Sequence, residues 1–111
     1  TEELEIKKKQ LELKEKEFEF DKWFKQQKLN LERARIAIAK EKDPWKQYKQ
    51  FLDFTKKVTS LMDAIENSEN LPNEAKISML GELIDYLPLS EEQKSKVREH
   101  IVRKYTTEKK K

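Results

Sequence analysis

The sequence has no cysteine, a single glycine and a single histidine among its 111 residues. Without cysteine it has no disulfide, no thiolate ligand for a metal and no thiol nucleophile. One glycine cannot build a glycine-rich phosphate loop, and one histidine cannot by itself supply a histidine metal cluster. No apolar run approaches the roughly 18 residues of a membrane span. We therefore expect no cofactor, no metal centre and no membrane-spanning segment.

Charge is what the chain has in abundance. Charged residues make up 42% of the sequence, and 25 Lys and Arg stand against 22 Asp and Glu, for a net charge of +3. A composition rich in Glu, Lys, Leu and Arg is typical of coiled coils and long helices. Disordered chains are also poor in hydrophobic residues. The ten aromatic residues and the near balance of charge favour a folded helical protein.

Proline and capping residues divide the chain into four helices. No Gly or Pro occurs in residues 1–42, and Asp43 and Pro44 then suit the N-cap and the first position of a new helix. Ser90 and Gln93 have the spacing of a capping box. The sequence predicts an all-α fold, in which a long coiled-coil-like helix precedes a small three-helix bundle. The predicted segments are a long helix for oligomerisation at 1–42, a bundle at 43–105 with helices at about 44–66, 74–87 and 91–105, and a basic tail at 106–111.

Apolar residues in the first segment repeat every seven positions. The triplets that begin at Leu4, Leu11 and Phe18 are followed, after an interval of eleven, by pairs that begin at Leu29 and Ile36. Eleven residues make almost three helical turns, so the repeat stays on one face. Charge pairs four residues apart also favour a helix. These pairs are Glu3–Lys7, Glu5–Lys9, Glu12–Lys16 and Asp21–Lys25.

Each repeat places two apolar residues two positions apart, which puts them roughly 200° apart around a helix. The helix therefore has two apolar stripes on nearly opposite sides. Stripe one consists of Leu4, Leu11, Phe18, Leu29 and Ile36. Stripe two consists of Ile6, Leu13, Phe20, Phe24, Leu31 and Ile38, with Trp23 and Ala34 beside it. A two-stranded coiled coil needs only one such stripe.

Two opposed stripes need a neighbour on each side. A helical sheet, a higher oligomer, or a helix held between a partner and the rest of its own chain would each provide one. A helix of about 40 residues is about 60 Å long, more than the rest of the chain can cover on both sides. We therefore predict a homo-oligomer, or association with another helical protein, through the residues of both stripes. The predicted interface is Leu4, Ile6, Leu11, Leu13, Phe18, Phe20, Trp23, Phe24, Leu29, Leu31, Ile36 and Ile38.

The sequence offers little chemistry. His100 lies beside Glu99, but no nucleophile with an orienting partner accompanies them, so we do not expect an enzyme. No motif identifies a family. We expect a structural or assembly protein, such as a scaffold, adaptor or shell component, in the cytoplasm or in an intracellular or viral assembly. The single glycine, Gly81, fits either a close helix approach or a tolerated position on a side face.

Nucleic-acid binding is the alternative. Residues 90–111 carry 8 basic and 4 acidic residues, a net charge of +4, and the last two predicted helices could resemble a helix-turn-helix. The acidic residues dilute this surface, and the turn lacks the glycine that is frequent in that motif. Binding to a membrane surface ranks last, because the long helix has two apolar faces and mixed charge. The candidate nucleic-acid contacts are Lys94, Lys96, Arg98, Arg103, Lys104, Lys109, Lys110 and Lys111.

Overall fold

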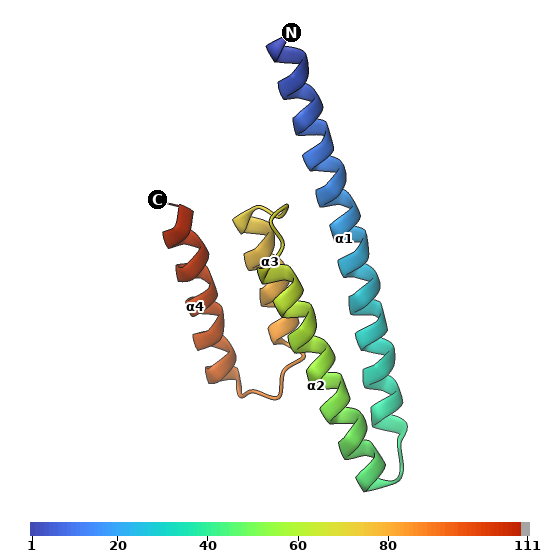
Figure 1. Ribbon diagram of the computed structural model, residues 1–111. Helices are drawn as coiled ribbons and strands as arrows, with labels where there is room; N and C mark the ends of the chain where they lie inside the picture. The colour runs from blue at the N-terminus through green and yellow to red at the C-terminus, as the bar shows by residue number, and fades with distance from the viewer. Residues whose placement is uncertain (110–111) are drawn as a thin grey trace.

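The computed structural model describes residues 1–109, which form four helices and no strand (Figure 1). The helices are α1 (Glu2–Lys40), α2 (Pro44–Glu66), α3 (Asn73–Ile84) and α4 (Glu91–Lys109). The predicted all-α fold is confirmed. Its coiled-coil detail concerns contacts with another chain and stays a prediction.

Two predicted helix starts are confirmed at the level of hydrogen bonds. The carboxylate of Asp43 accepts from the backbone N–H of Trp45 at 3.1 Å, with Pro44 as the first helical residue of α2. At the start of α4, Ser90 Oγ accepts from the N–H of Gln93 at 3.2 Å. Gln93 Oε1 accepts in return from the N–H of Ser90 at 3.0 Å. These bonds satisfy N–H groups that have no partner within the helix.

Three predicted helix ends differ from the structure. Helix α1 ends at Lys40 rather than at 42, because the backbone of Glu41 is extended. Helix α3 ends at Ile84 rather than at 87, because the N–H groups of Tyr86 and Leu87 bond to carbonyls three residues back and tighten the chain into turns. Pro88 also disfavours a helical conformation in the residue before it. Helix α4 continues to Lys109, so residues 106–109 of the predicted tail are helical, while 110–111 lie outside the described residues.

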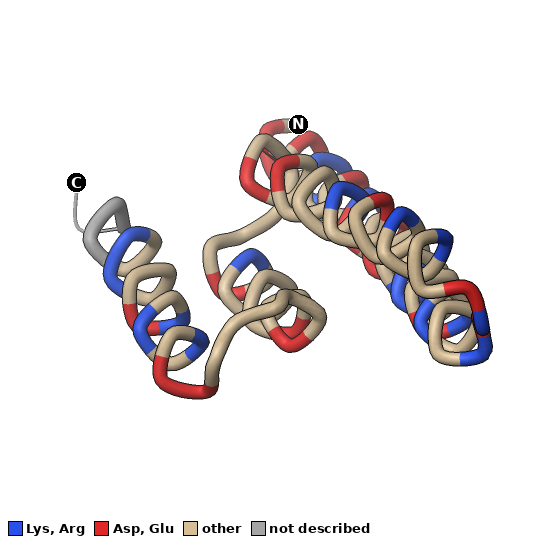
Figure 2. The backbone as a smooth tube through the Cα atoms, turned by 90° about the horizontal axis from the view of Figure 1, so that it is seen from below, with Lys and Arg blue, Asp and Glu red and all other residues tan. Residues whose placement is uncertain are grey.

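The helices lie side by side in the order α1, α2, α3, α4. Figure 1 shows α1 and α2 as an antiparallel hairpin, and in Figures 1 and 2 α3 lies between that hairpin and α4. All four helices contribute to one core, so α1 is not separate from the C-terminal helices. The core residues are Phe24, Leu31, Phe54, Val58, Ile65, Leu71, Met79, Leu80, Leu83, Ile84, Ile101 and Tyr105.

The lengths of the helices determine how much of α1 is covered. At 1.5 Å per residue, the 39 residues of α1 span about 58 Å and the 23 residues of α2 only about 34 Å. The first half of α1 therefore extends past the other helices (Figure 1), and every residue from 1 to 19 is exposed. We call residues 1–19 the projecting half of α1 and residues 20–40 the packed half.

Gly81 has open space around it. A Cβ atom at this position would have no other atom within 4 Å, apart from its own helix backbone and chain neighbours. The glycine is therefore not required for a close helix approach, and the interpretation as a tolerated glycine agrees with the structure.

Candidate functional site

Stripe two packs against the chain's own core in the second half of α1. Phe24 and Leu31 are each only 2% exposed, and Phe20, Ala34 and Ile38 are half-buried beside them. Trp23, at the edge of the stripe, is 36% exposed and lies 4.9 Å from the Phe20 ring between centroids. The predicted interface residues Phe20, Phe24, Leu31 and Ile38 thus contribute to the monomer core, where Phe24 and Leu31 are out of a partner's reach.

Stripe one is exposed along the whole helix. Its exposed fractions are 59% for Leu4, 60% for Leu11, 60% for Phe18, 46% for Leu29 and 54% for Ile36. Single exposed apolar residues are common on protein surfaces. Here five large apolar side chains lie in one row, and contiguous apolar patches of this kind typically mark interaction sites.

In the projecting half both stripes are exposed, since Ile6 and Leu13 of stripe two are also more than half exposed. No side chain of residues 1–19 makes an ion pair or hydrogen bond to another described residue. Among the four charge pairs expected from the sequence, only Asp21–Lys25 forms, at 3.2 Å. Exposed pairs are worth so little that their side chains readily extend into water.

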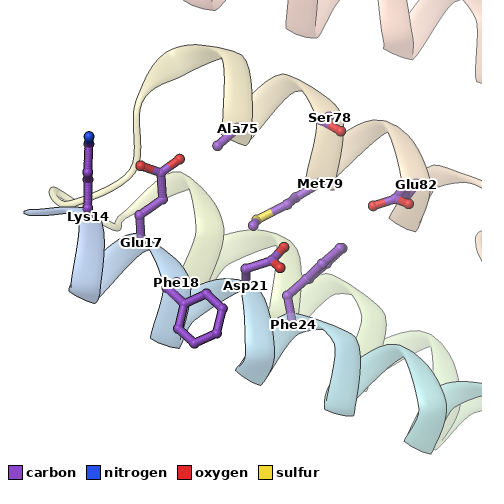
Figure 3. Close-up of a pocket in the computed structure, with 9 residues that line it drawn as sticks. All are labelled: Lys14, Glu17, Phe18, Asp21, Phe24, Ala75, Ser78, Met79 and Glu82. Atoms are coloured by element: carbon purple, nitrogen blue, oxygen red, sulfur yellow. The ribbon is translucent and has the colours of Figure 1, made fainter.

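A groove of about 420 Å³ lies where the projecting half leaves α3 (Figure 3). Phe24 and Met79 are its buried residues, and in Figure 3 Met79 points from α3 towards α1. The groove rim is charged on both sides, and Glu82 pairs with Lys28 at 3.0 Å. The groove is lined by Lys14, Glu17, Phe18, Asp21, Phe24, Ala75, Ser78, Met79 and Glu82.

A polar cluster around Tyr86 joins the packed half to the end of α3. The Tyr86 hydroxyl donates to Glu32 Oε1 at 2.6 Å, and the Arg35 guanidinium lies over the Tyr86 ring at 5.0 Å. Burial, followed by the hydrogen bond to Glu32, raises the pKa of Tyr86 to about 12. Sequence reasoning missed this cluster, because no local pattern links residues 54 positions apart.

The basic residues proposed for nucleic-acid contact lie among carboxylates in α4 (Figure 2). Each of the five whose side chains are described has an acidic partner within 4.0 Å. The pairs are Lys94–Glu91, Lys96–Glu92, Arg98–Asp85, Arg103–Glu99 and Lys104–Glu66. The side chain of Lys109 and the whole of Lys110 and Lys111 lie outside the described residues. The described part of α4 therefore lacks a continuous positive surface.

A second exposed apolar patch lies on the first turns of α2. Trp45 and Tyr48 are 63% and 53% exposed and stack at 5.9 Å between ring centroids, and Lys49 lies over Trp45 at 5.1 Å. Leu52 is 41% exposed. The first turns of α2 therefore carry an apolar surface outside the core.

Other features of the described residues add no chemistry. His100 is exposed, and Glu99 beside it pairs with Arg103 at 3.5 Å. Among residues 1–106, whose side chains the structure describes, no three His, Asp or Glu side chains are placed to hold a metal ion. In the same range no helix has the length and apolar character needed to cross a membrane.

Comparison with known proteins gives no relative for this chain. No family model, curated protein or solved structure matches it. The functional argument therefore rests on the exposed surface of α1.

Proposed function

We propose that this protein is a non-enzymatic structural or assembly protein that forms homo-oligomers by helix–helix association through α1. The observation that carries the proposal is the exposure of stripe one along the full length of a helix whose opposite face is already packed. A scaffold, adaptor or shell component would use such a helix, in the cytoplasm or inside an intracellular or viral assembly.

The free energy available from this surface supports association. Full burial of one Leu, Ile or Phe side chain contributes roughly 1.5–3 kcal/mol. Stripe one has five such residues, each close to or above half exposed. Covering them in one contact would provide several kcal/mol, which is of the order that a specific complex needs after the cost of lost translational freedom.

The projecting half gives a second argument. Helices in water gain most of their stability from packing of an apolar face. Residues 1–19 have no such packing within the described chain. They are helical as an extension of the packed half of α1. A neighbouring helix would therefore stabilise this half as well as cover its apolar residues.

The nucleic-acid alternative stays a prediction. The acidic partners of its five described basic residues weaken the charge argument on which it was based. No observation among the described residues favours it over association through α1.

Sedimentation velocity over a range of protein concentrations tests the proposal. We expect an oligomer for the unaltered chain and a shift towards monomer for Leu11→Asp. The matched control is Gln10→Asp, which places the same side chain on the same helix one position outside stripe one. A monomer at every concentration, or equal sedimentation of the two variants, would contradict the proposal.

A further inference from the structure

Two rows of opposite charge flank stripe one in the projecting half. Glu5, Glu12 and Glu19 each follow a stripe residue by one position, and Lys7 and Lys14 follow one by three. At about 100° per residue, these offsets put the Glu row and the Lys row on opposite sides of the stripe. All five side chains are exposed, and none makes an ion pair with another described residue.

The charge rows discriminate between orientations of two paired helices. In a parallel pair the left flank of one helix faces the right flank of the other, whereas in an antiparallel pair like flanks face each other. Parallel pairing in register therefore places the Glu row of each copy against the Lys row of the other. Antiparallel pairing centred on Leu11 places Glu against Glu and Lys against Lys, which is unfavourable.

Antiparallel pairing over the full length is the stronger competitor. Centred near residue 20, it would place Leu4 against Ile36 and Leu11 against Leu29 of the other copy, so these apolar residues match, but Phe18 would lie against Lys22. It would also place Lys8 near Arg33 and Lys14 near Lys25, and these like charges repel. One contact is favourable, Lys7 with Glu32, but Glu32 already accepts the Tyr86 hydroxyl. Parallel pairing in register matches all five apolar residues and opposes the Glu row to the Lys row. Its like-charge contacts are those of Lys8 and Glu15 with their own equivalents, because each follows a stripe residue by four positions.

We propose that stripe one binds a second copy of this chain in parallel and in register. Each residue of stripe one then packs against its equivalent, and Lys7 and Lys14 lie beside the Glu row of the partner. The core contacts of α1 are made mainly by stripe two, and every residue of stripe one is exposed. Near residue 18 the contact would also border the groove beside α3, which Lys14 and Phe18 help to line. This proposal rests on the proposed function and adds the partner and its orientation.

Disulfide trapping tests the orientation, since the chain has no cysteine of its own. Single-cysteine variants Leu4→Cys and Ile36→Cys are oxidised separately and as a mixture, with Gln10→Cys as the control for random collision. Parallel pairing predicts that Leu4→Cys alone and Ile36→Cys alone form disulfide dimers, at least about tenfold faster than Gln10→Cys, because pairing raises the local thiol concentration.

The outcomes separate failure of the orientation from failure of the proposed function. Disulfides that join Leu4→Cys to Ile36→Cys in the mixture, with neither variant linking to itself, would show full-length antiparallel pairing and overturn the inference. In a second mixture, of Leu4→Cys with Phe18→Cys, disulfides between the two variants would show antiparallel pairing about Leu11 and also overturn the inference. An oligomer in sedimentation with trapping no faster than Gln10→Cys would place the contact elsewhere and overturn it too. A monomer in sedimentation would instead contradict the proposed function itself.

Discussion

The two halves of α1 share a seven-residue apolar repeat but differ in what they contact. In the packed half, stripe two follows alternating steps of four and three residues through Phe20, Phe24, Gln27, Leu31, Ala34 and Ile38. The same steps continued into the projecting half pass through Glu17, Leu13, Gln10 and Ile6. Every second position thus changes from polar to apolar between Glu17 and Phe24, which is where burial in the core begins.

This difference shows why a repeat alone does not decide which partner a helix has. A stripe with an apolar residue every seven positions provides one apolar contact per two helical turns. The seam of a heptad coiled coil needs two apolar contacts per two turns. In the packed half both sets of positions are apolar except at Gln27, and the chain's own core covers this stripe. In the projecting half each stripe has only one apolar residue per seven positions, with charged residues between successive apolar ones. This pattern suits a pairing in which charges beside the stripe add to a narrow apolar row.

The largest expected effect is a difference in the free energy of unfolding between substitutions in the two halves of α1. Leu31→Ala removes a side chain that is 2% exposed, so we expect it to lower the free energy of unfolding by about 2–5 kcal/mol. Leu13→Ala, on the same stripe but 52% exposed, should change the free energy by less than about 0.5 kcal/mol under conditions where the protein is monomeric. Urea denaturation followed by circular dichroism measures both, and equal effects would erase the distinction between the halves.

Much of the fold follows from local sequence signals. Asp43 with Pro44, and Ser90 with Gln93, predict helix starts through hydrogen bonds that involve neighbouring residues only. The two stripes likewise follow from periodicity. Which stripe the chain itself covers depends on where α2 and α3 pack, and that is a long-range property. The Tyr86–Glu32 contact is of the same kind, so neither could be predicted from the sequence.

The second prediction reverses one charge row of the projecting half. Lys7→Glu combined with Lys14→Glu places Glu rows against each other in a parallel pair, and we expect association to weaken by more than about tenfold, or about 1.4 kcal/mol. Adding Glu12→Lys and Glu19→Lys restores opposite rows and should recover most of the affinity. Sedimentation equilibrium at low salt measures the series, because salt screens exposed charges.

An antiparallel pair centred on Leu11 would respond differently. There the Lys7→Glu and Lys14→Glu changes replace one like-charged contact by another, and association would stay nearly constant. If the fourfold variant does not recover its affinity, the charges change the stability of the helix within one copy and do not interact across the contact. Either result contradicts parallel pairing.

The third prediction concerns how the packed half is fixed to α3. Tyr86→Phe removes the hydroxyl that donates to Glu32 but leaves the ring against Arg35 and Phe54, so we expect a loss of about 0.5–1.5 kcal/mol in the free energy of unfolding at pH 7. The difference between the two proteins should also depend on pH. The folded-state pKa is about 12, against an ordinary value of 10.0, so the contribution is complete below pH 10 and is lost as the pH rises towards 12.

Denaturation of both proteins at pH 7 and pH 11 checks this pH dependence. Lysines titrate in the same range, and subtracting the Tyr86→Phe values removes their shared contribution. A stability difference that stays constant from pH 7 to pH 11 would mean that the Tyr86 hydroxyl keeps its ordinary pKa in the folded protein.

The smallest effect tests whether stability and association belong to different halves of α1. Gly81→Ala should raise the free energy of unfolding by about 0.5–1 kcal/mol, since alanine favours the helix and its Cβ would meet no other atom within 4 Å. The added Cβ would touch no residue of stripe one, so the association constant should not change. Thermal denaturation and sedimentation of the same samples measure the two quantities. Tighter association in Gly81→Ala would show that the core of the packed half and the pairing of the projecting half are energetically coupled.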